Sequence, residues 1–230
     1  MITLWMPGSA MKSLLKKIIV SLFPLQMLRY RAYKILIKNT DSYLYLTGWM
    51  NSLEEVKPLD INGSPIPWMN YPTVKLLEEK LTKDLNLFEY ASGYSTHFYA
   101  AKVKTVTSVE YDEKWFDVIQ PMVPSGVKLI FKKQDVDGDY CRTIGSTDEQ
   151  YDIVIVDGRD RVNCIKQSIA ALSSSGVILL DDSQRESYQE GFDFAQKNGF
   201  KALNIEGLKA TGVGIDRATI FYREGNCLKI

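Results

Sequence analysis

The sequence lacks an excess of charge of either sign. Its 230 residues contain 28 Lys and Arg against 28 Asp and Glu. Proteins that bind nucleic acid usually carry a basic excess, so the balance argues against nucleic acid as a partner. Cysteine is also scarce: Cys141, Cys164 and Cys227 lie far apart and form no Cys-x-x-Cys pair. This disfavours a disulfide framework or a zinc site and favours a reducing compartment such as the cytoplasm.

Long hydrophobic runs are absent too. The apolar stretch from Ile18 to Leu28 is broken by Pro24 and is too short to span a bilayer, and no signal-peptide cleavage site follows it. Over the longer segment of residues 11–38, Lys and Arg are mixed with apolar residues on both sides of this stretch. Two interpretations follow: a basic amphipathic segment in peripheral contact with a membrane, or a helix packed on the body of the protein or in a homodimer interface. The second interpretation, a helix packed on the body or in a dimer interface, is the commoner arrangement.

From Leu87 onward, apolar strand-like runs alternate with helical patterns, and no internal repeat is visible. This order predicts an α/β fold with a Rossmann-like, seven-stranded, mostly parallel sheet. The last two strands are joined by a glycine-containing stretch without helical period, which predicts a C-terminal antiparallel hairpin. The expected strands are residues 86–90, 105–111, 127–135, 151–158, 176–182, 200–207 and 217–223.

The residues before about Thr73 differ in composition and do not alternate between strand and helix patterns. Pro65, Pro67 and Pro72 are closely spaced among turn formers and aromatic residues. We expect a helical and irregular cap over residues 1–72, and a cofactor-binding domain over residues 73–230. A helix from about Tyr71 to Lys83 leads into the first strand.

The first strand ends in "FEYASGYST", which combines an acid, small residues and a helix start. Parallel sheets bind ligands at the carboxyl ends of their strands. Small side chains let the backbone approach a ligand closely, and the helix N-terminus adds a positive dipole end. Two more acids end the next strands. Glu110 lies 17 residues after Gly93, where an acid accepts hydrogen bonds from ribose hydroxyls, and Asp135 is placed near an adenine amino group.

On these residues the sequence resembles the class I S-adenosylmethionine-dependent methyltransferases, with Ala91 in place of the first glycine of their motif. The resemblance covers about Thr73 to Arg223 and implies S-adenosylmethionine as cofactor. Glu89 and the turn would hold its methionine part, Glu110 its ribose, and Asp135 with Val136 its adenine. The full implied cofactor set is Glu89, Ala91, Ser92, Gly93, Tyr94, Ser95, Thr96, Glu110, Tyr111, Asp135, Val136 and Asp157.

A second acidic group ends the fourth and fifth strands: Asp157, Asp181 and Asp182. Neighbouring strands would bring the three carboxylates together, and a hard cation such as Mg²⁺ would offset their repulsion. The pattern is similar to catechol-type and sugar O-methyltransferases, which implies that the three acids are metal ligands. Asp157 or Asp160 would take the proton of the acceptor. The alternative is that Asp182 or Ser183 caps the next helix.

Several other side chains are candidates for the acceptor site. Trp68 and Tyr71 would stack on an acceptor, or only pack the cap onto the domain. Arg159, Arg161 and Arg185 would balance the acids or bind an anionic acceptor, or be solvated. His97, the only histidine, is better explained as a packed or cofactor-neighbouring residue than as a base.

The leading hypothesis is therefore an S-adenosylmethionine-dependent O-methyltransferase. Its acceptor would be a sugar, a glycan or another small diol, and the basic N-terminus would suit an acceptor beside a membrane. The alternatives are an NAD-dependent oxidoreductase and a non-catalytic cofactor-binding protein. The missing Gly-x-Gly-x-x-Gly run counts against the oxidoreductase. The absence of an Asn/Asp-Pro-Pro-aromatic motif counts against methylation of a base amine.

Overall fold

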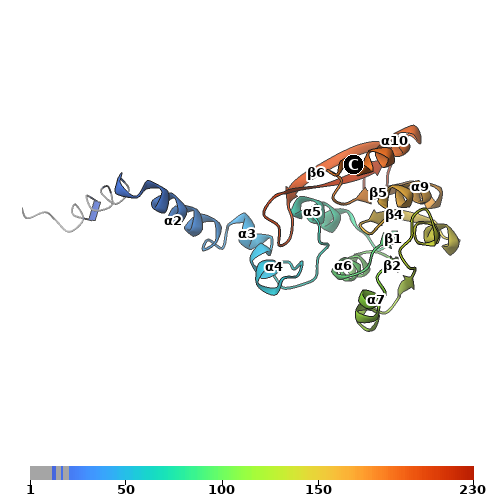
Figure 1. Ribbon diagram of the computed structural model, residues 1–230, viewed down its shortest axis with the longest axis horizontal. Helices are drawn as coiled ribbons and strands as arrows, with labels where there is room; N and C mark the ends of the chain where they lie inside the picture. Colours follow the sequence, from blue (N-terminus) through green and yellow to red (C-terminus); the bar gives the residue numbers. More distant parts are fainter. Residues whose placement is uncertain (1–11, 14–16, 18–20) are drawn as a thin grey trace, which may run out of the picture.

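A seven-stranded sheet forms the centre of the molecule (Figure 1), in a computed structural model that describes residues 12, 13, 17 and 21–230. The strand order is β3-β2-β1-β4-β5-β7-β6. Strands β1 to β5 pair in parallel, and β7 is antiparallel to both β5 and β6. The predicted sheet and its terminal hairpin are thus confirmed. The strands are β1 (Asn86–Tyr90), β2 (Thr105–Glu110), β3 (Val127–Phe131), β4 (Tyr151–Val156), β5 (Leu172–Leu180), β6 (Lys201–Leu208) and β7 (Ile215–Tyr222).

Two cores cover the two faces of the sheet, because successive strand residues point to opposite sides. Leu87 and Ile155 belong to the core that includes α5 and α6. Phe88 and Val154 belong to the core that includes α8, α9 and α10. These helices, with α7 beside β2, are α5 (Tyr71–Lys80), α6 (Tyr94–Lys102), α7 (Glu113–Ile119), α8 (Asp139–Arg142), α9 (Arg161–Ala171) and α10 (Gln189–Lys197). Because β1, β2, β4 and β5 run parallel, their carboxyl ends lie together at one edge of the sheet.

Several element boundaries differ from the sequence-based prediction. Strand β3 ends at Phe131 rather than at Asp135, so Asp135 lies in the loop after the strand. Helix α5 ends at Lys80 rather than Lys83, because the chain turns extended at Leu81. Strand β5 begins at Leu172, directly after α9, and not at Gly176. Between β3 and β4 the chain forms the short α8 and a 3₁₀ helix over Thr143–Thr147, which are too short to give a helical period in the sequence.

The cap folds onto the β6–β7 loop of its own chain. It contains α3 (Tyr43–Leu46) and α4 (Trp49–Glu55). The indole of Trp49 donates to the carbonyl of Gly212, and the indole of Trp68 donates to that of Ala210, both at 2.9 Å. Asn70 caps α5 through Thr73 and also donates to Ile205 on β6. These contacts fix the cap beside the edge of the sheet where the candidate site lies.

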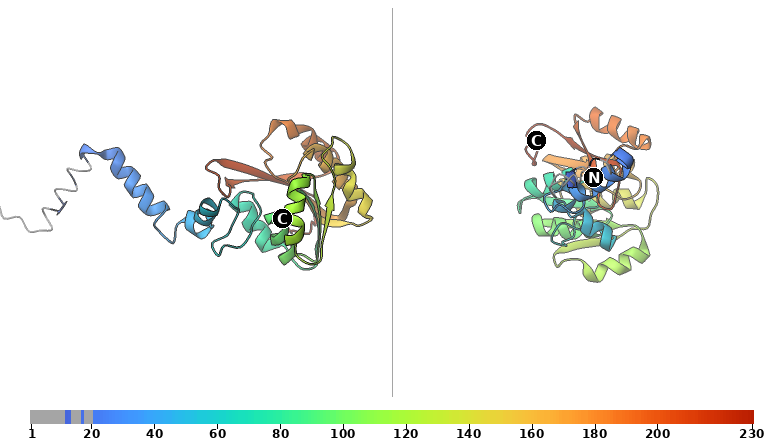
Figure 2. Two further views of the ribbon diagram at one scale, coloured as in Figure 1. Left: turned by 60° about the horizontal axis from the view of Figure 1, so that its bottom comes forward. Right: turned by 90° about the vertical axis from the view of Figure 1, so that its left-hand side faces the viewer.

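Helix α2 (Pro24–Leu36) projects away from the rest of the molecule (Figures 1 and 2). None of its residues is buried, so this part of the N-terminal segment is not the packed helix that the sequence favours. The earlier part of that segment, at residues 14–16 and 18–20, lies outside the described residues. In the described part of the chain, no helix combines the length and hydrophobicity of a membrane span.

Candidate functional site

The turn after β1 lies between the ends of β2 and β4. Tyr90 pairs with Val109 and with Val156, so the chain leaves the sheet at its middle. Ala91 has φ of 79°, in the left-handed region that favours glycine. The alanine thus adopts the conformation of the glycine it replaces, at a cost of about 1 kcal/mol. The sequence pattern suggests free N–H groups here, but the N–H groups of residues 91–93 all donate within the protein. No N–H group of this turn is therefore free for a ligand, and each of its carbonyl oxygens also accepts one hydrogen bond within the protein.

Glu89 lies beneath the turn and is only 1% exposed. Its carboxylate accepts hydrogen bonds from the hydroxyls of Ser95, Thr96 and Ser108. Burial raises the pKa of Glu89 to about 7, and these hydroxyl donors oppose the rise. The residue ties β1 and β2 to the first turn of α6. It shapes the predicted methionine pocket from below.

Glu110 supports the same turn from β2. One carboxylate oxygen accepts from the amides of Tyr111 and Asp112, and the other accepts from the amide of Ser92 at 2.9 Å. Burial raises the pKa of Glu110, and these backbone donors oppose the rise. An oxygen with one donor keeps a lone pair for a ribose hydroxyl. Trp115, which the sequence does not single out, donates to the carbonyl of Ser92 at 2.8 Å and closes the side of the turn.

The residues expected to contact the adenine, Asp135 and Val136, lie in the loop after β3. Asp160, one of the two expected proton acceptors, lies in the loop after β4, and the two loops are in contact. Asp135 accepts from the amides of Asp139 and Tyr140 at the start of α8, and Val136 is 80% exposed. Asp160 accepts from the amide of Asp137 at 2.8 Å and from the amide group of Asn163. Asp160 thus holds this loop, and only Asp157 of the two predicted proton acceptors belongs to the acid cluster below.

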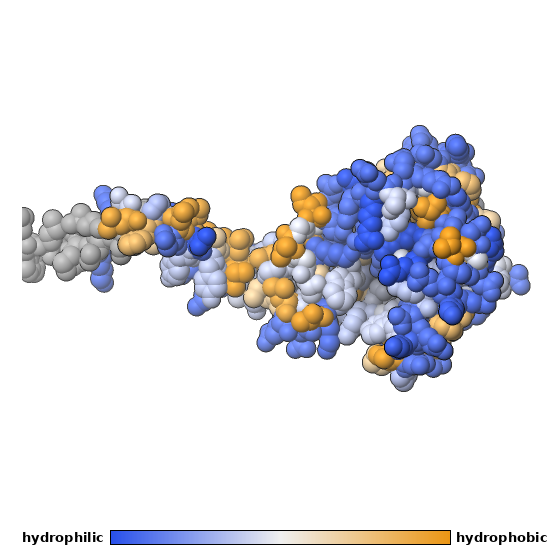
Figure 3. Space-filling model, in the orientation of Figure 1, coloured by the Kyte–Doolittle hydropathy of each residue, from blue (hydrophilic) through white to orange (hydrophobic). Residues whose placement is uncertain are grey.

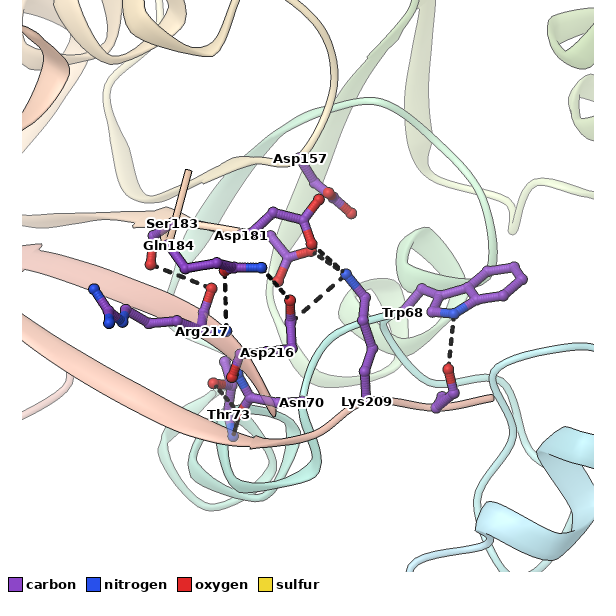
Figure 4. Close-up of polar contacts among 12 residues, drawn as sticks. Trp68, Asn70, Thr73, Asp157, Asp181, Ser183, Gln184, Lys209, Asp216 and Arg217 are labelled. Atoms are coloured by element: carbon purple, nitrogen blue, oxygen red, sulfur yellow. Dashed lines mark hydrogen bonds and ion pairs between the residues drawn. The ribbon is translucent and has the colours of Figure 1, made fainter. Parts of the chain in front are cut away.

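Asp157, Asp181 and Asp182 converge as predicted, with one oxygen from each within 4.8 Å of the others. Figure 4 shows Asp157 and Asp181 side by side. We call these three residues the acid cluster. Burial raises the pKa of Asp157 to about 6 and that of Asp181 to about 7. One oxygen of Asp181 is buried without a hydrogen-bond partner among the described residues, as is the hydroxyl of Tyr99. The cluster therefore retains acceptor capacity.

Lys209 supplies the positive charge at this cluster. Its ammonium lies 2.8 Å from Asp181 and 2.8 Å from Asp182, and 3.7 Å from Asp216 (Figure 4). Burial alone would lower the pKa of Lys209, but the carboxylates raise it above its ordinary value. The sequence motifs did not reveal Lys209 or Asp216. The predicted hairpin could have indicated them. Because β7 runs antiparallel to β5, the loop between β6 and β7 lies at the same edge of the sheet as the end of β5.

Arg161 is a second internal cation, and only 8% of it is exposed. Its guanidinium donates to the side chain of Asp157 at 3.0 Å and to the backbone carbonyls of Asp157, Gly158 and Asp181. It is therefore not a solvated arginine. Arg159 and Arg185 are exposed: Arg159 lies over the ring of Tyr111 and Arg185 pairs with Asp182.

The side chains of the acid cluster can be compared with the ligands that a metal ion would need. Three carboxylates, one with a free buried oxygen, match the ligands that Mg²⁺ prefers. However, the ammonium of Lys209 already lies against two of them. The capping alternative is wrong, because helical structure resumes only at Glu186, and the hydroxyl of Ser183 donates to the carbonyl of Arg217.

The aromatic candidates are divided between two places. Trp68 is 41% exposed and stands on the far side of Lys209 from the acid cluster (Figure 4). Tyr71 is buried, packs edge-on against Tyr43, and lines a cavity of about 670 Å³ between the cap, α5 and α6. His97 lines the same cavity and takes no part in the acid cluster.

The comparisons place this geometry in a known fold. A precorrin-6y C5,15-methyltransferase from Geobacter metallireducens superposes with a TM-score of 0.50 and 16% identity, over 67% of this chain and 88% of that one. The O-methyltransferase TomG from Streptomyces achromogenes, involved in tomaymycin synthesis and solved with S-adenosylmethionine, gives 0.50 and 15%, over 66% and 77%. The chain has the methyltransferase fold. No family model and no curated protein sequence matches it.

Proposed function

We propose that the protein is an S-adenosylmethionine-dependent O-methyltransferase. The observation that carries the proposal is the turn at residues 91–93, held between the buried carboxylates of Glu89 and Glu110 and opening beside the acid cluster. The cofactor carries an ammonium group and ribose hydroxyls, all of them donors. Each carbonyl of the turn accepts one hydrogen bond and keeps a second lone pair, as does the Glu110 oxygen that accepts from Ser92, and these lone pairs can accept from the donors of the cofactor.

Asp157 is the residue proposed to take the proton. The acceptor hydroxyl oxygen attacks the methyl carbon, the carbon–sulfur bond breaks with its electrons left on sulfur, and S-adenosylhomocysteine departs. The hydroxyl proton passes to the carboxylate of Asp157. Its pKa of about 6, raised by burial and held down by Arg161 and Lys209, leaves it ionised yet basic near neutral pH.

In this proposal Lys209 and Arg161 are the cations that stabilise the acid cluster, and no step depends on a metal. The magnesium site that the sequence predicts at Asp157, Asp181 and Asp182 is the alternative to this arrangement, and the chelator experiment below distinguishes the two. If bound, the ion would supply a Lewis acid that lowers the pKa of the acceptor hydroxyl. Because Lys209 lies against the same oxygens, the metal would have to displace its ammonium.

The acceptor proposed is a sugar, a glycan or another small molecule with neighbouring hydroxyls. A carboxylate can accept a hydrogen bond from a hydroxyl group of the acceptor molecule, and the neighbouring lysine can donate one to it. The exposed face of Trp68 offers a surface on which a sugar or a flat ring can stack. Arg159 and Arg185 at the rim suit an acceptor that also carries an anionic group. No observation favours the oxidoreductase or the non-catalytic alternative.

The test is transfer of a labelled methyl group from S-adenosylmethionine to a panel of sugars, sugar phosphates and catechols, with and without a chelator. We expect turnover that the chelator leaves unchanged, and an Asp157→Asn variant about 100-fold slower in kcat. Asp193→Asn, an exposed acid on α10, is the matched control and retains full activity. Equal activity of Asp157→Asn would remove the proposed base. Loss with the chelator and rescue by Mg²⁺ would establish the metal instead.

A further inference from the structure

Helix α2 exposes an apolar face that nothing in the described chain covers. Leu25, Leu28 and Ile35 are 65%, 62% and 61% exposed. Soluble proteins expose single apolar side chains routinely, but a continuous apolar face marks a contact site. In α3, Tyr43 and Leu46 are also 51% and 56% exposed, but they line the cavity between the cap, α5 and α6. Figure 3 shows hydrophobic side chains gathered along α2 and the adjoining cap, whereas the surface of the main domain in this view is mostly hydrophilic.

The apolar residues of α2 form one stripe. Leu25, Leu28, Ala32 and Ile35 are spaced by three or four residues, which places them along one side of a helix. At 100° per residue, Arg29 and Arg31 fall on the two borders of this stripe. Long basic side chains at such borders can keep their charge in a polar layer while their stems lie along an apolar one.

The charge of this end of the chain is one-sided. Residues 1–40 hold seven of the 28 Lys and Arg and none of the 28 Asp and Glu, which leaves 21 basic against 28 acidic residues in the rest. Within the described part, Tyr30 and Tyr33 stand beside Lys34 and Lys38, with the ammonium groups 5.4 and 5.8 Å from the ring centres. Basic residues beside aromatic rings are typical of the interfacial zone of a bilayer.

We propose that α2 lies in the interface of a membrane rich in anionic lipid and holds the protein there. The apolar stripe would enter the acyl boundary while the basic residues meet the lipid phosphates. Pairing of α2 with α2 of a second copy fits the charges less well, because it would bring together two helices that carry only basic charge. Since α2 leads through α3 into the cap, and the cap is bonded to the loop that carries Lys209, docking would position the candidate site near the lipid surface.

The experiment is co-sedimentation of the full chain with vesicles of phosphatidylcholine alone or with added phosphatidylglycerol. We expect binding only when phosphatidylglycerol is present, and weakening by salt. Two variants test the two halves of the inference: Leu25→Asp with Leu28→Asp and Ile35→Asp, and Arg29→Gln with Arg31→Gln, Lys34→Gln and Lys38→Gln. Each should lower the partition coefficient about tenfold or more.

The matched control carries Val118→Asp and Val213→Asp, exposed apolar residues outside the N-terminal segment, and should bind like the unchanged chain. All of the substituted positions on α2 are exposed, and circular dichroism checks that the fold is retained. The proposal is overturned by absence of binding, by equal loss in the control, or by undiminished binding of both α2 variants. It is also overturned if light scattering shows a dimer that the α2 variants dissociate, because α2 would then be a contact between copies.

Discussion

Lys209 connects three carboxylates that would otherwise repel one another at the carboxyl edge of the sheet. Two of them, Asp181 and Asp182, follow β5, and Asp216 belongs to β7. Asp181 is fully buried, so an uncompensated charge there is costly. The sequence indicates correctly that the acids converge and need positive charge. The sequence suggests arginines as one source of that charge, and Arg161 and Arg185 do pair with the acids, but no motif points to Lys209.

Replacing Lys209 by methionine should therefore destabilise the protein by about 3 kcal/mol at pH 8. The loss should be smaller at pH 5, because Asp181 and Asp216, with pKa values raised by burial to about 7 and about 6, are then protonated. Urea unfolding at the two pH values measures both effects. Lys201→Met, which removes only an exposed pair with Glu224, is the control and should unfold like the unchanged protein. Equal stability of Lys209→Met at pH 8 would show that the pairs contribute nothing.

The raised pKa of Glu89 leads to a second prediction, on how stability depends on pH. Its pKa is raised by burial from 4.5 to about 7, so the folded state holds this proton more tightly than the unfolded state does. The stability that comes from this group is full below pH 4.5 and is lost as the pH rises towards 7. Glu89→Gln cannot titrate. Its free energy of unfolding, relative to the unchanged protein, should rise by up to about 3 kcal/mol between pH 4.5 and 8.

Urea titrations across this range measure the difference, with the exposed Glu149→Gln as the control. A constant difference for Glu89→Gln over the whole range would mean that Glu89 is already ionised at pH 5. The buried network with Ser95, Thr96 and Ser108 would then stabilise the charged form much more strongly than described here.

At the scale of elements, the sheet was predictable and the connections were not. The β-branched runs and the helices between them define the strands, because two-sided burial leaves a simple pattern, as in Ile153–Val156. The short α8 leaves none. The cap was predictable as irregular, but its contacts depend on two indoles that reach carbonyls more than 140 residues away. For Arg161 the sequence left open whether it balances the acids or is solvated, and the structure buries it against Asp157.

The bond from the indole of Trp68 to the carbonyl of Ala210 can be tested on its own. Trp68→Phe keeps most of the ring and removes the donor, so the cap should open about fivefold more often, for a lost bond of about 1 kcal/mol. Hydrogen exchange of the α4 amides should accelerate by this factor while the amides of β1 and β4 stay unchanged. Trp115→Phe loses the bond to Ser92 instead and should affect only the turn. Unchanged exchange in α4 would mean that Trp68 does not hold the cap.

At the scale of the whole molecule, the chain combines a methyltransferase fold, a cap bonded to the terminal hairpin, and a basic helix that projects from it. The two buried glutamates and the acid cluster lie at the same edge of the sheet. A cofactor in the turn would thus have its methyl group beside Asp157. Cofactor binding is the property on which the proposed function depends.

The most direct measurement is a calorimetric titration with S-adenosylhomocysteine, with NAD as the comparison ligand. We predict binding of S-adenosylhomocysteine, no heat from NAD, and affinity reduced about tenfold or more in Glu110→Gln, which loses a charged acceptor for the ribose. Glu149→Gln should bind like the unchanged protein. Absence of S-adenosylhomocysteine binding, or binding of NAD in its place, would contradict the account.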